Sequence, residues 1–272
     1  DIVASPRRAP GKLSCIPTLA EPRLEPIRTA VICLVISKDA MASSDQLSEG
    51  KRGFRIGILA IQGAFLEHQV ALKKAQSCFR PDISIEVMEI RHLRDIKPDL
   101  DGVIIPGGES TTVSMFLQRN GMIEPLRDWI QSKNHVTWGT CAGMILLSKI
   151  TENQKIGGQS TLSIMDTDVS RNFFGRQMQS FEADISLLDE ELKITAGKNN
   201  FHGVFIRAPA ITETYTPEVK VLATLHRDDA ENDIIVAAKQ GNVFSTAFHP
   251  ELTDDYTWHL YFLQLIEKVK NS

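Results

Sequence analysis

From residue 52 onward, short apolar runs alternate with segments of helical spacing. Nearly continuous apolar runs are typical of strands buried on both faces of a sheet, and apolar residues three or four apart are typical of helices. The expected strands are 54–61, 83–90, 102–105 and 135–138, and the expected helices are 64–75, 110–117 and 123–133. The helix at 110 is expected to be capped by Ser110 or Thr111. Strands that alternate with helices predict an α/β fold with a mostly parallel sheet covered on both faces.

The pattern changes after Lys149, where short β-type runs follow one another with turn signals between them. These runs are 164–169, 203–206, 219–225, 234–238 and 243–248. They predict added antiparallel strands, with a tight turn at 240–242. The last segment, 254–270, has one apolar face and predicts an amphipathic closing helix.

Residues 1–50 show no sustained hydrophobic period and contain five prolines. We expect them to be an extension outside the fold, disordered or foreign to it, with Met41 as the natural start; an organelle transit peptide is the alternative. Their one apolar stretch, 30–36, is much shorter than the roughly 20 residues that a bilayer-spanning helix needs. Residues 51–272 are therefore expected to form the functional domain.

The composition argues against several classes of partner. The chain has 30 Lys and Arg against 34 Asp and Glu, a formal net charge of −4, so it has no basic excess for binding nucleic acid. Its 4 cysteines are widely spaced and fit a reducing compartment better than a disulfide framework. We therefore expect a cytoplasmic protein that binds neither nucleic acid nor membrane. No spacing typical of metal ligands occurs.

Candidate chemistry begins at the segment Gly139-Thr140-Cys141-Ala142-Gly143, between an apolar strand and an apolar helix. This spacing is the cysteine form of a strand–turn–helix nucleophile elbow, in which small residues allow a sharp turn. The turn would expose Cys141 at the carboxyl end of the sheet. The first amides of the helix would favour a thiolate and supply donors for an oxyanion. A buried structural cysteine explains this segment alone equally well.

A base and a carboxylate follow at the end of a later apolar strand, in Phe248-His249-Pro250-Glu251. If strand alternation continues through this segment, His249 and Glu251 point to the same side. The carboxylate could then orient the imidazole, and the imidazole could accept the thiol proton. Alone, this motif is more often a strand end that runs into a loop. Together with the elbow, it favours a triad of Cys141, His249 and Glu251.

The segment Pro106-Gly107-Gly108-Glu109-Ser110 ends the third strand just before a helix. Its glycines permit close backbone approach, which favours an oxyanion hole beside Cys141, although a simple tight turn fits as well. Glu109 could hold an α-amino group. Arg171 and Arg207 are candidates to bind a carboxylate, and a solvated surface position is the ordinary alternative for each.

Taken together, these motifs resemble the triad-type (class I) glutamine amidotransferases and, within them, the glutaminase subunits of pyridoxal 5′-phosphate synthase, the PdxT/SNO family. The resemblance covers about residues 54–270. Its markers, besides the three motifs above, are the segments 57–64, 172–177, 180–184, 203–209 and 236–241. It implies a flavodoxin-like three-layer sandwich. The stretches 185–202 and 210–233 match loosely and are expected to carry longer loops.

The resemblance also implies the chemistry, which is hydrolysis of L-glutamine to L-glutamate and ammonia without a cofactor or metal. Cys141 would attack the side-chain amide, His249 would protonate the departing ammonia and then activate water, and Glu251 would orient His249. The amides of Gly108 and Ala142 would stabilise the oxyanion. Glutamine would be bound by Gly108, Glu109, Ser110, Arg171, Ile206 and Arg207. Ammonia would pass to a (β/α)-barrel synthase subunit that builds the vitamin B6 cofactor.

Other functions remain open on the sequence. The glutaminase could serve another acceptor, such as imidazole glycerol phosphate synthase, or the chain could be a non-catalytic regulatory subunit. The intact Cys141, His249 and Glu251 argue against a non-catalytic subunit. A cysteine peptidase on the same scaffold is a weaker alternative, because Glu109 and the two arginines suit a free amino acid better than a peptide.

Overall fold

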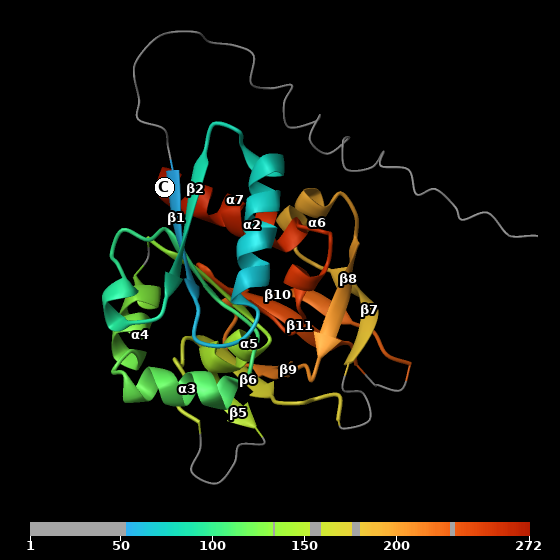
Figure 1. Ribbon diagram of the computed structural model, residues 1–272. Coiled ribbons are helices and arrows are strands. Elements are labelled where there is room, and N and C mark those ends of the chain that lie inside the picture. Colours follow the sequence, from blue (N-terminus) through green and yellow to red (C-terminus); the bar gives the residue numbers. More distant parts are fainter. Residues whose placement is uncertain (1–52, 133, 153–158, 176–179, 229–231) are drawn as a thin grey trace, which may run out of the picture. The chain divides into compact units, whose positions relative to one another are not determined.

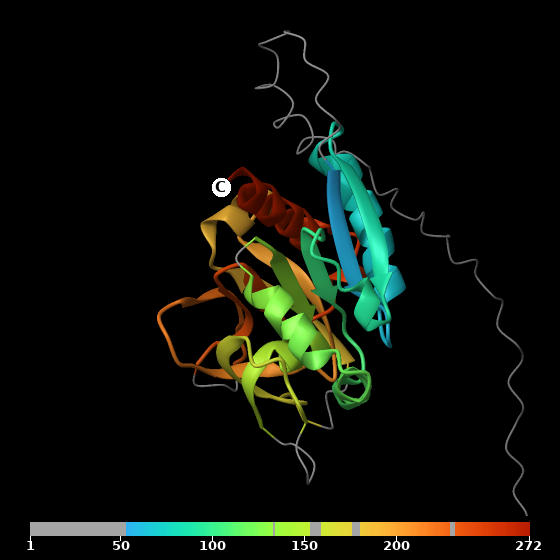
Figure 2. The same ribbon diagram turned by 90° about the vertical axis from the view of Figure 1, so that its left-hand side faces the viewer.

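The computed structural model of the 272-residue chain describes residues 53–132, 134–152, 159–175, 180–228 and 232–272 (Figures 1 and 2). The extension expected over residues 1–50 lies outside these ranges, as do Arg176 and Gln177 of the marker segment 172–177. Within the described ranges, no helix is both long and apolar enough to cross a bilayer. The same residues contain no group of three or more His, Cys, Asp or Glu side chains that could hold a metal ion.

Five strands form the parallel half of a sheet that has twelve strands in the described part of the chain, in the order β2-β1-β3-β4-β12. Their bounds are β1 Gly53–Leu59, β2 Ser84–Ile90, β3 Gly102–Ile105, β4 Val136–Thr140 and β12 Val243–Thr246. Every residue of β3, β4 and β12 is buried, as expected for apolar runs covered on both faces. The predicted parallel core of an α/β fold is confirmed.

The second half of the sheet is antiparallel and continues from β12 in the order β11-β10-β7-β8. A branch made of β5, β6 and β9 joins it where β9 pairs with β11. The bounds are β5 Ser148–Glu152, β6 Met165–Ser170, β7 Ser180–Leu187, β8 Asn200–Ile206, β9 Ala210–Thr214, β10 Val219–Leu225 and β11 Ile234–Gln240. Gly241, with φ of 59°, makes the predicted turn between β11 and β12. The predicted antiparallel strands are confirmed for β8, β10 and β11, whereas the run 243–248 forms β12, which pairs parallel with β4, and β6 pairs parallel with β5 and antiparallel with β9.

The two stretches that match the family loosely contain regular structure among the described residues. The stretch 185–202 contains the end of β7, helix α6 (Glu190–Ala196) and the start of β8, and 210–233 contains β9 and β10. Asp189 caps the start of helix α6, and its side chain accepts a hydrogen bond from the Leu192 amide at 2.9 Å. A cap of this kind stabilises a short helix. Helix α6 has too few apolar residues to show the hydrophobic periodicity by which a helix is predicted from sequence.

Helices cover both faces of the sheet. One face carries α2 (Phe65–Phe79), α6 and α7 (Thr257–Asn271), and the other carries α3 (Ser110–Arg119), α4 (Ile123–Gln131) and α5 (Ala142–Leu147). Neighbouring residues of β4 point to opposite layers, because strand side chains alternate. The Trp138 ring packs against Phe262 of α7, whereas Gly139 lies against Gly143 of α5. Helices α2 and α7 pack against each other, and in Figure 1 α7 passes behind α2.

The core on the α7 side is aromatic. Trp138 of β4 and Phe244 of β12 stack with ring centroids 5.2 Å apart, and Trp258 and Phe262 of α7 pack on them. The predicted closing helix thus places its apolar face where the parallel and antiparallel halves of the sheet meet. This junction fixes β4 and β12 side by side, and both strands end at the candidate site.

Candidate functional site

Cys141 lies between the end of β4 and the start of α5, with φ of 47° and ψ of −97°. A positive φ in a residue other than glycine costs free energy and is concentrated at functional sites. The amide of Cys141 donates to the carbonyl of Thr246 on β12 at 2.7 Å. Gly143 packs so closely on β3 that a Cβ atom there would lie 2.1 Å from the carbonyl oxygen of Ile105. These two contacts hold a strand–turn–helix elbow with Cys141 at its tip.

His249 and Glu251 reach the elbow from a 3-10 turn. Strand β12 ends at Thr246, and the turn η2 (Pro250–Leu252) begins directly after His249. Continued strand alternation is therefore the wrong reason for their pairing. The turn places Oε1 of Glu251 2.7 Å from Nδ1 of His249, and both side chains are buried. A ring that donates from Nδ1 leaves Nε2 to exchange a proton with the thiol.

Burial and neighbouring charges together set the protonation of this pair. Burial lowers the pKa of His249, but hydrogen bonds and charge interactions with Cys141 and Glu251 outweigh it and raise that pKa to about 10. For Glu251, burial raises the pKa, whereas His68 and His249 lower it, and the net pKa lies below the ordinary value. A protonated imidazole beside an ionised carboxylate is thus the favoured state near neutral pH.

Replacing Cys141 with alanine is expected to lower the pKa of His249, because the variant loses the interaction that most strongly opposes burial. Ring NMR signals of His249, followed against pH in wild type and variant, measure this change. A pKa raised in the folded state stabilises the protein fully below the unfolded value near 6.5, and this stabilisation is lost as pH rises through about 10. In the variant, this stabilisation should disappear at a lower pH, because the pKa of His249 is lower. An unchanged His249 titration would contradict the contact between the two side chains.

A hollow of ≈ 450 Å³, here named the site hollow, lies over Cys141. Its lining includes Gly108, Glu109, Ser110, Cys141, Arg171, Ile206, Arg207 and His249. Glu251 lies behind His249, and Ala142 is buried in the first turn of α5, so neither of them lines the hollow. The structure thus brings the residues singled out from the sequence to one place, although they come from segments far apart along the chain.

Two charged residues of the site hollow pair with each other. Nη2 of Arg171 lies 3.5 Å from Oε1 of Glu109, and Oε2 of Glu109 accepts a hydrogen bond from the Thr112 amide at 2.7 Å. Glu109, with its extended backbone, is therefore the cap of α3, and the expectation that Ser110 or Thr111 caps it is wrong. Burial raises the pKa of Glu109, but the hydrogen bonds from the start of α3 outweigh it and lower the net pKa.

The end of β8 closes the site hollow from the antiparallel side. The carbonyl oxygen of Ile206 lies 3.8 Å from Sγ of Cys141. Arg207, the next residue, has φ of 46°, a second strained position beside the thiol. The parallel half of the sheet therefore supplies the elbow, and the antiparallel half supplies the wall opposite it.

Two polar residues that the sequence analysis did not single out hold the loop at Gly107 and Gly108. The amide of Gly107 donates to Oγ1 of Thr140 at 2.9 Å, and the amide of Glu109 donates to Oε1 of Gln62 at 2.7 Å. A signal for them exists in the sequence, because both lie at the carboxyl ends of parallel strands, where open α/β sheets bind ligands. They position the loop beside Cys141.

The fold and this geometry can be compared with known proteins. The model of the SNO glutamine amidotransferase family matches residues 58–268. Pyridoxal 5'-phosphate synthase subunit PdxT of Methanosarcina barkeri is 45% identical over 215 residues, which cover 79% of this chain and 98% of that protein. Probable pyridoxal 5'-phosphate synthase subunit pdx2 of Dictyostelium discoideum is 39% identical over 236 residues, with 79% and 94% covered. A crystal structure of a glutamine amidotransferase has a TM-score of 0.65 at 38% identity and covers 78% of this chain and 98% of its own. With four fifths of its length matched in sequence and its fold matched in a solved structure, the chain belongs to the SNO glutamine amidotransferase family.

Proposed function

We propose that this chain is the glutaminase subunit of a pyridoxal 5′-phosphate synthase. It hydrolyses L-glutamine to L-glutamate and ammonia, and the ammonia passes to the synthase subunit. The observation that carries this proposal is the buried His249–Glu251 pair at the strained Cys141, in a hollow whose charges suit a free amino acid. Relatives that are named pyridoxal 5'-phosphate synthase subunits support the choice of acceptor.

The proposed reaction proceeds through an acyl-enzyme. The sulfur of Cys141 attacks the side-chain amide carbon of glutamine, and the amides of Gly108 and Ala142 stabilise the oxyanion. The proton held by His249 goes to the amide nitrogen, the C–N bond breaks and ammonia leaves. His249 then removes a proton from water, whose oxygen attacks the thioester and releases glutamate. Glu251 keeps the ring of His249 oriented throughout.

Binding of the substrate relies on charge complementarity. Glutamine is a zwitterion, and the site hollow presents the Glu109 carboxylate beside the guanidinium of Arg171. Its ammonium would replace Arg171 as a partner of Glu109, and its carboxylate would be bound by Arg171 and Arg207. Ser110 and Ile206 would flank the chain that leads to Cys141.

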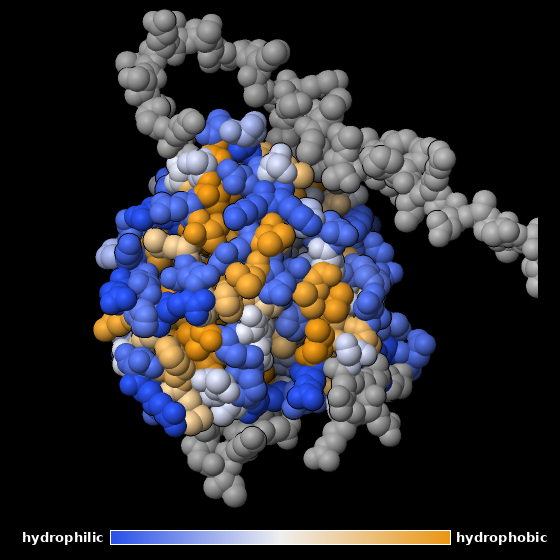
Figure 3. All heavy atoms as spheres, in the orientation of Figure 1, coloured by the Kyte–Doolittle hydropathy of each residue, from blue (hydrophilic) through white to orange (hydrophobic). Residues whose placement is uncertain are grey.

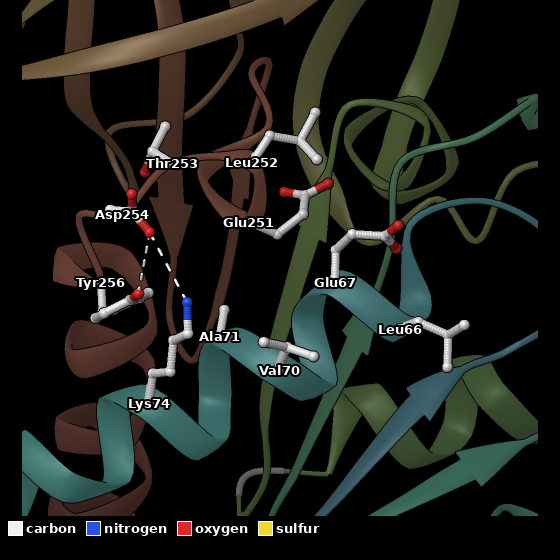
Figure 4. Close-up of a pocket in the computed structure, with 10 residues that line it drawn as sticks. All are labelled: Leu66, Glu67, Val70, Ala71, Lys74, Glu251, Leu252, Thr253, Asp254 and Tyr256. Carbon is white, nitrogen blue, oxygen red and sulfur yellow. Dashed lines mark hydrogen bonds and ion pairs between the residues drawn. The ribbon is translucent and has the colours of Figure 1, made fainter.

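The surface beside the site supports a protein partner. Leu66 and Val70 of α2 and Leu252 of η2 are each about half exposed and line one hollow of ≈ 310 Å³, with Leu252 also lining the site hollow. Apolar side chains over α2 are visible in Figure 3, and Figure 4 shows Leu66, Val70 and Leu252 around this second hollow. A group of exposed apolar side chains of this kind is typical of interaction surfaces.

The widely spaced cysteines support a reducing compartment, the cytoplasm.

The direct test is glutamate release from glutamine by the full chain with and without the barrel subunit of pyridoxal 5′-phosphate synthase. We expect the barrel subunit to copurify and to raise the glutaminase rate. If the barrel of imidazole glycerol phosphate synthase binds and activates the chain instead, the acceptor is wrong. If no barrel elicits glutamate release, and a glutamine-analogue electrophile fails to label Cys141 in the complex, the chain is not a glutaminase.

Substituting Arg171 with lysine is expected to raise KM for glutamine by about tenfold or more, because a hydrogen bond between charged groups is lost while the reacting atoms stay in place. The kcat should change much less. Steady-state kinetics with the synthase present measure both quantities. Arg119→Lys, at the exposed end of α3, is the matched control and should leave KM unchanged. Equal KM values for the two variants would remove Arg171 from the glutamine site.

A further inference from the structure

A chain of buried polar groups extends behind Glu251, beyond the three residues of the proposed triad. His68 of α2 and His259 of α7 are both fully buried, and Nδ1 of His68 lies 3.0 Å from Nε2 of His259. The other ring nitrogen of His68, Nε2, lies 3.4 Å from Oε2 of Glu251 and 3.2 Å from Oγ1 of Thr140. The proposed reaction uses neither histidine.

Filling the space between α2 and α7 with two buried imidazoles costs more free energy than filling it with apolar side chains. The buried face of α2 otherwise consists of Ala71, Leu72, Ala75 and Phe79, and an apolar side chain at position 68 would continue it. Burying a polar ring costs free energy unless its nitrogens have partners. The partner that His68 reaches is the second carboxylate oxygen of Glu251, which has no hydrogen-bond partner of good geometry within the described residues.

The geometry selects one arrangement of ring protons. If Nδ1 of His68 carried the proton, its Nε2 could accept from the Thr140 hydroxyl, but it would turn a lone pair towards the Glu251 carboxylate, and the buried Nδ1–H of His259 would have no acceptor among the described residues. If Nε2 carries the proton, His68 donates towards Glu251 and accepts from Nε2–H of His259. The second arrangement gives the buried charge a donor and leaves only an uncharged lone pair of His259 without a partner, which costs less.

We propose that His68, held by His259, is a positioning residue that donates its Nε2–H to Glu251 and so fixes the carboxylate that orients His249. This inference rests on the proposed function. Figure 4 shows Glu251 lying over the turn of α2 that contains Glu67, Val70 and Ala71, the turn to which His68 belongs. One oxygen of the carboxylate is hydrogen-bonded to His249, and the other lies 3.4 Å from Nε2 of His68, so a donor at that nitrogen would oppose rotation of the carboxylate away from the imidazole.

The same ring also reaches the loop that faces the thiol. Oγ1 of Thr140 lies between Nε2 of His68 and the amide of Gly107, at 3.2 and 2.9 Å. A hydroxyl oxygen has two lone pairs and can accept from both donors. The single Nε2–H of His68 is shared between Oγ1 of Thr140, with which it has hydrogen-bond geometry, and Oε2 of Glu251, and in this way it connects the acid of the triad to the loop that carries Gly108. The charged and titratable groups that act on His68 are Glu67, His249, Glu251 and His259, and burial lowers the pKa of His68, so the ring is neutral near pH 7.

Kinetics with the synthase present test the positioning role. His68→Phe keeps an aromatic ring without a donor and is expected to lower kcat by about 10- to 100-fold with little change in KM. It should also move the acidic limb of the pH profile to higher pH, because Glu251 loses a donor that stabilises its charge. His68→Gln, whose amide can donate to Glu251, should recover most of kcat. In a Glu251→Gln background, His68→Phe should cost little, since the residue through which it acts is gone.

Two valine substitutions on β4 form a test and its matched control for the loss of a buried hydroxyl. Thr140→Val removes the hydroxyl shared by His68 and Gly107 and should lower kcat. Thr137→Val removes a buried hydroxyl that has no hydrogen-bond partner in the described part of the chain, and it should leave kcat unchanged. Equal effects of the two variants, or additive effects of His68→Phe and Glu251→Gln, would overturn the positioning role.

NMR of ring-labelled histidine tests the proton arrangement without any activity measurement. The full chain should show His68 as a neutral ring protonated at Nε2 around pH 7, and His68→Gln should shift the ring signals of His249. A ring protonated at Nδ1 would overturn the proposal even if the protein is an active glutaminase. If the glutaminase reaction is absent while the ring is protonated at Nε2, the proposed function fails and the histidine contact stands.

Discussion

Cys141→Ala is expected to lower glutamate release by about 10⁴-fold or more, because removal of a nucleophile leaves only what binding and oxyanion donors contribute. The structure makes this loss specific to one side chain. Among the described cysteines, Cys141 is the one that sits on the strained elbow and lines the site hollow. The measurement is glutamate release in complex with the synthase, with KM for glutamine determined separately.

Cys78→Ala is the matched control for this experiment. Cys78 lies near the end of α2, is partly exposed and does not line the site hollow, so its loss should leave the rate unchanged. A glutamine-analogue electrophile should label wild type and Cys78→Ala but not Cys141→Ala. If Cys141→Ala retains the full rate, the thiol mechanism is wrong.

Gly143→Ala is expected to lower the free energy of unfolding by about 3 kcal/mol or more, because the added methyl group would overlap a backbone atom that cannot withdraw. Its Cβ would lie 2.1 Å from the carbonyl oxygen of Ile105, the last residue of β3, which is the central strand of the parallel half. Either α5 moves away from β3 or the elbow opens. Both changes displace Cys141, so the activity should fall together with stability. Urea unfolding measures the first effect and glutamate release the second.

Gly121→Ala separates this steric effect from the general cost of replacing glycine. Gly121 has φ of 62°, and a Cβ there would meet nothing within 4 Å. The substitution should therefore cost only the conformational strain of about 1 kcal/mol and leave activity unchanged. Equal losses of stability in the two variants would show that the packing of α5 on β3 is looser than described.

The parallel half of the fold could be predicted because its strands appear in the sequence as nearly continuous apolar runs. The segment Val103–Ile105, for example, is buried on both faces and is apolar throughout. Strand β7 leaves a weak trace, since its first residues are partly or fully exposed and include Glu182 and Asp184. A half-exposed strand of this kind differs little from a polar loop in composition.

In the candidate site, features formed by neighbouring residues could be predicted from the sequence, whereas contacts between distant segments could not. The elbow is encoded by the five residues around Cys141, so its backbone could be expected from the sequence. The pairing of His249 with Glu251 was expected for the wrong reason, because a 3-10 turn and a strand place residues two apart differently. The contact between His68 and Glu251 joins two distant segments, and the only local hint was a histidine on the apolar face of α2.

The strand order has a consequence for when the protein becomes competent during its synthesis. Strand β4, which ends at Cys141, pairs on one side with β3, made earlier, and on the other with β12, made more than a hundred residues later. The Cys141 amide needs the Thr246 carbonyl of β12, and His249 follows only after that strand. Pairings over such a long sequence separation form late in folding. A nascent chain therefore carries its thiol in an unfinished pocket, and glutamine hydrolysis can begin only after the last strand has been inserted between β4 and β11.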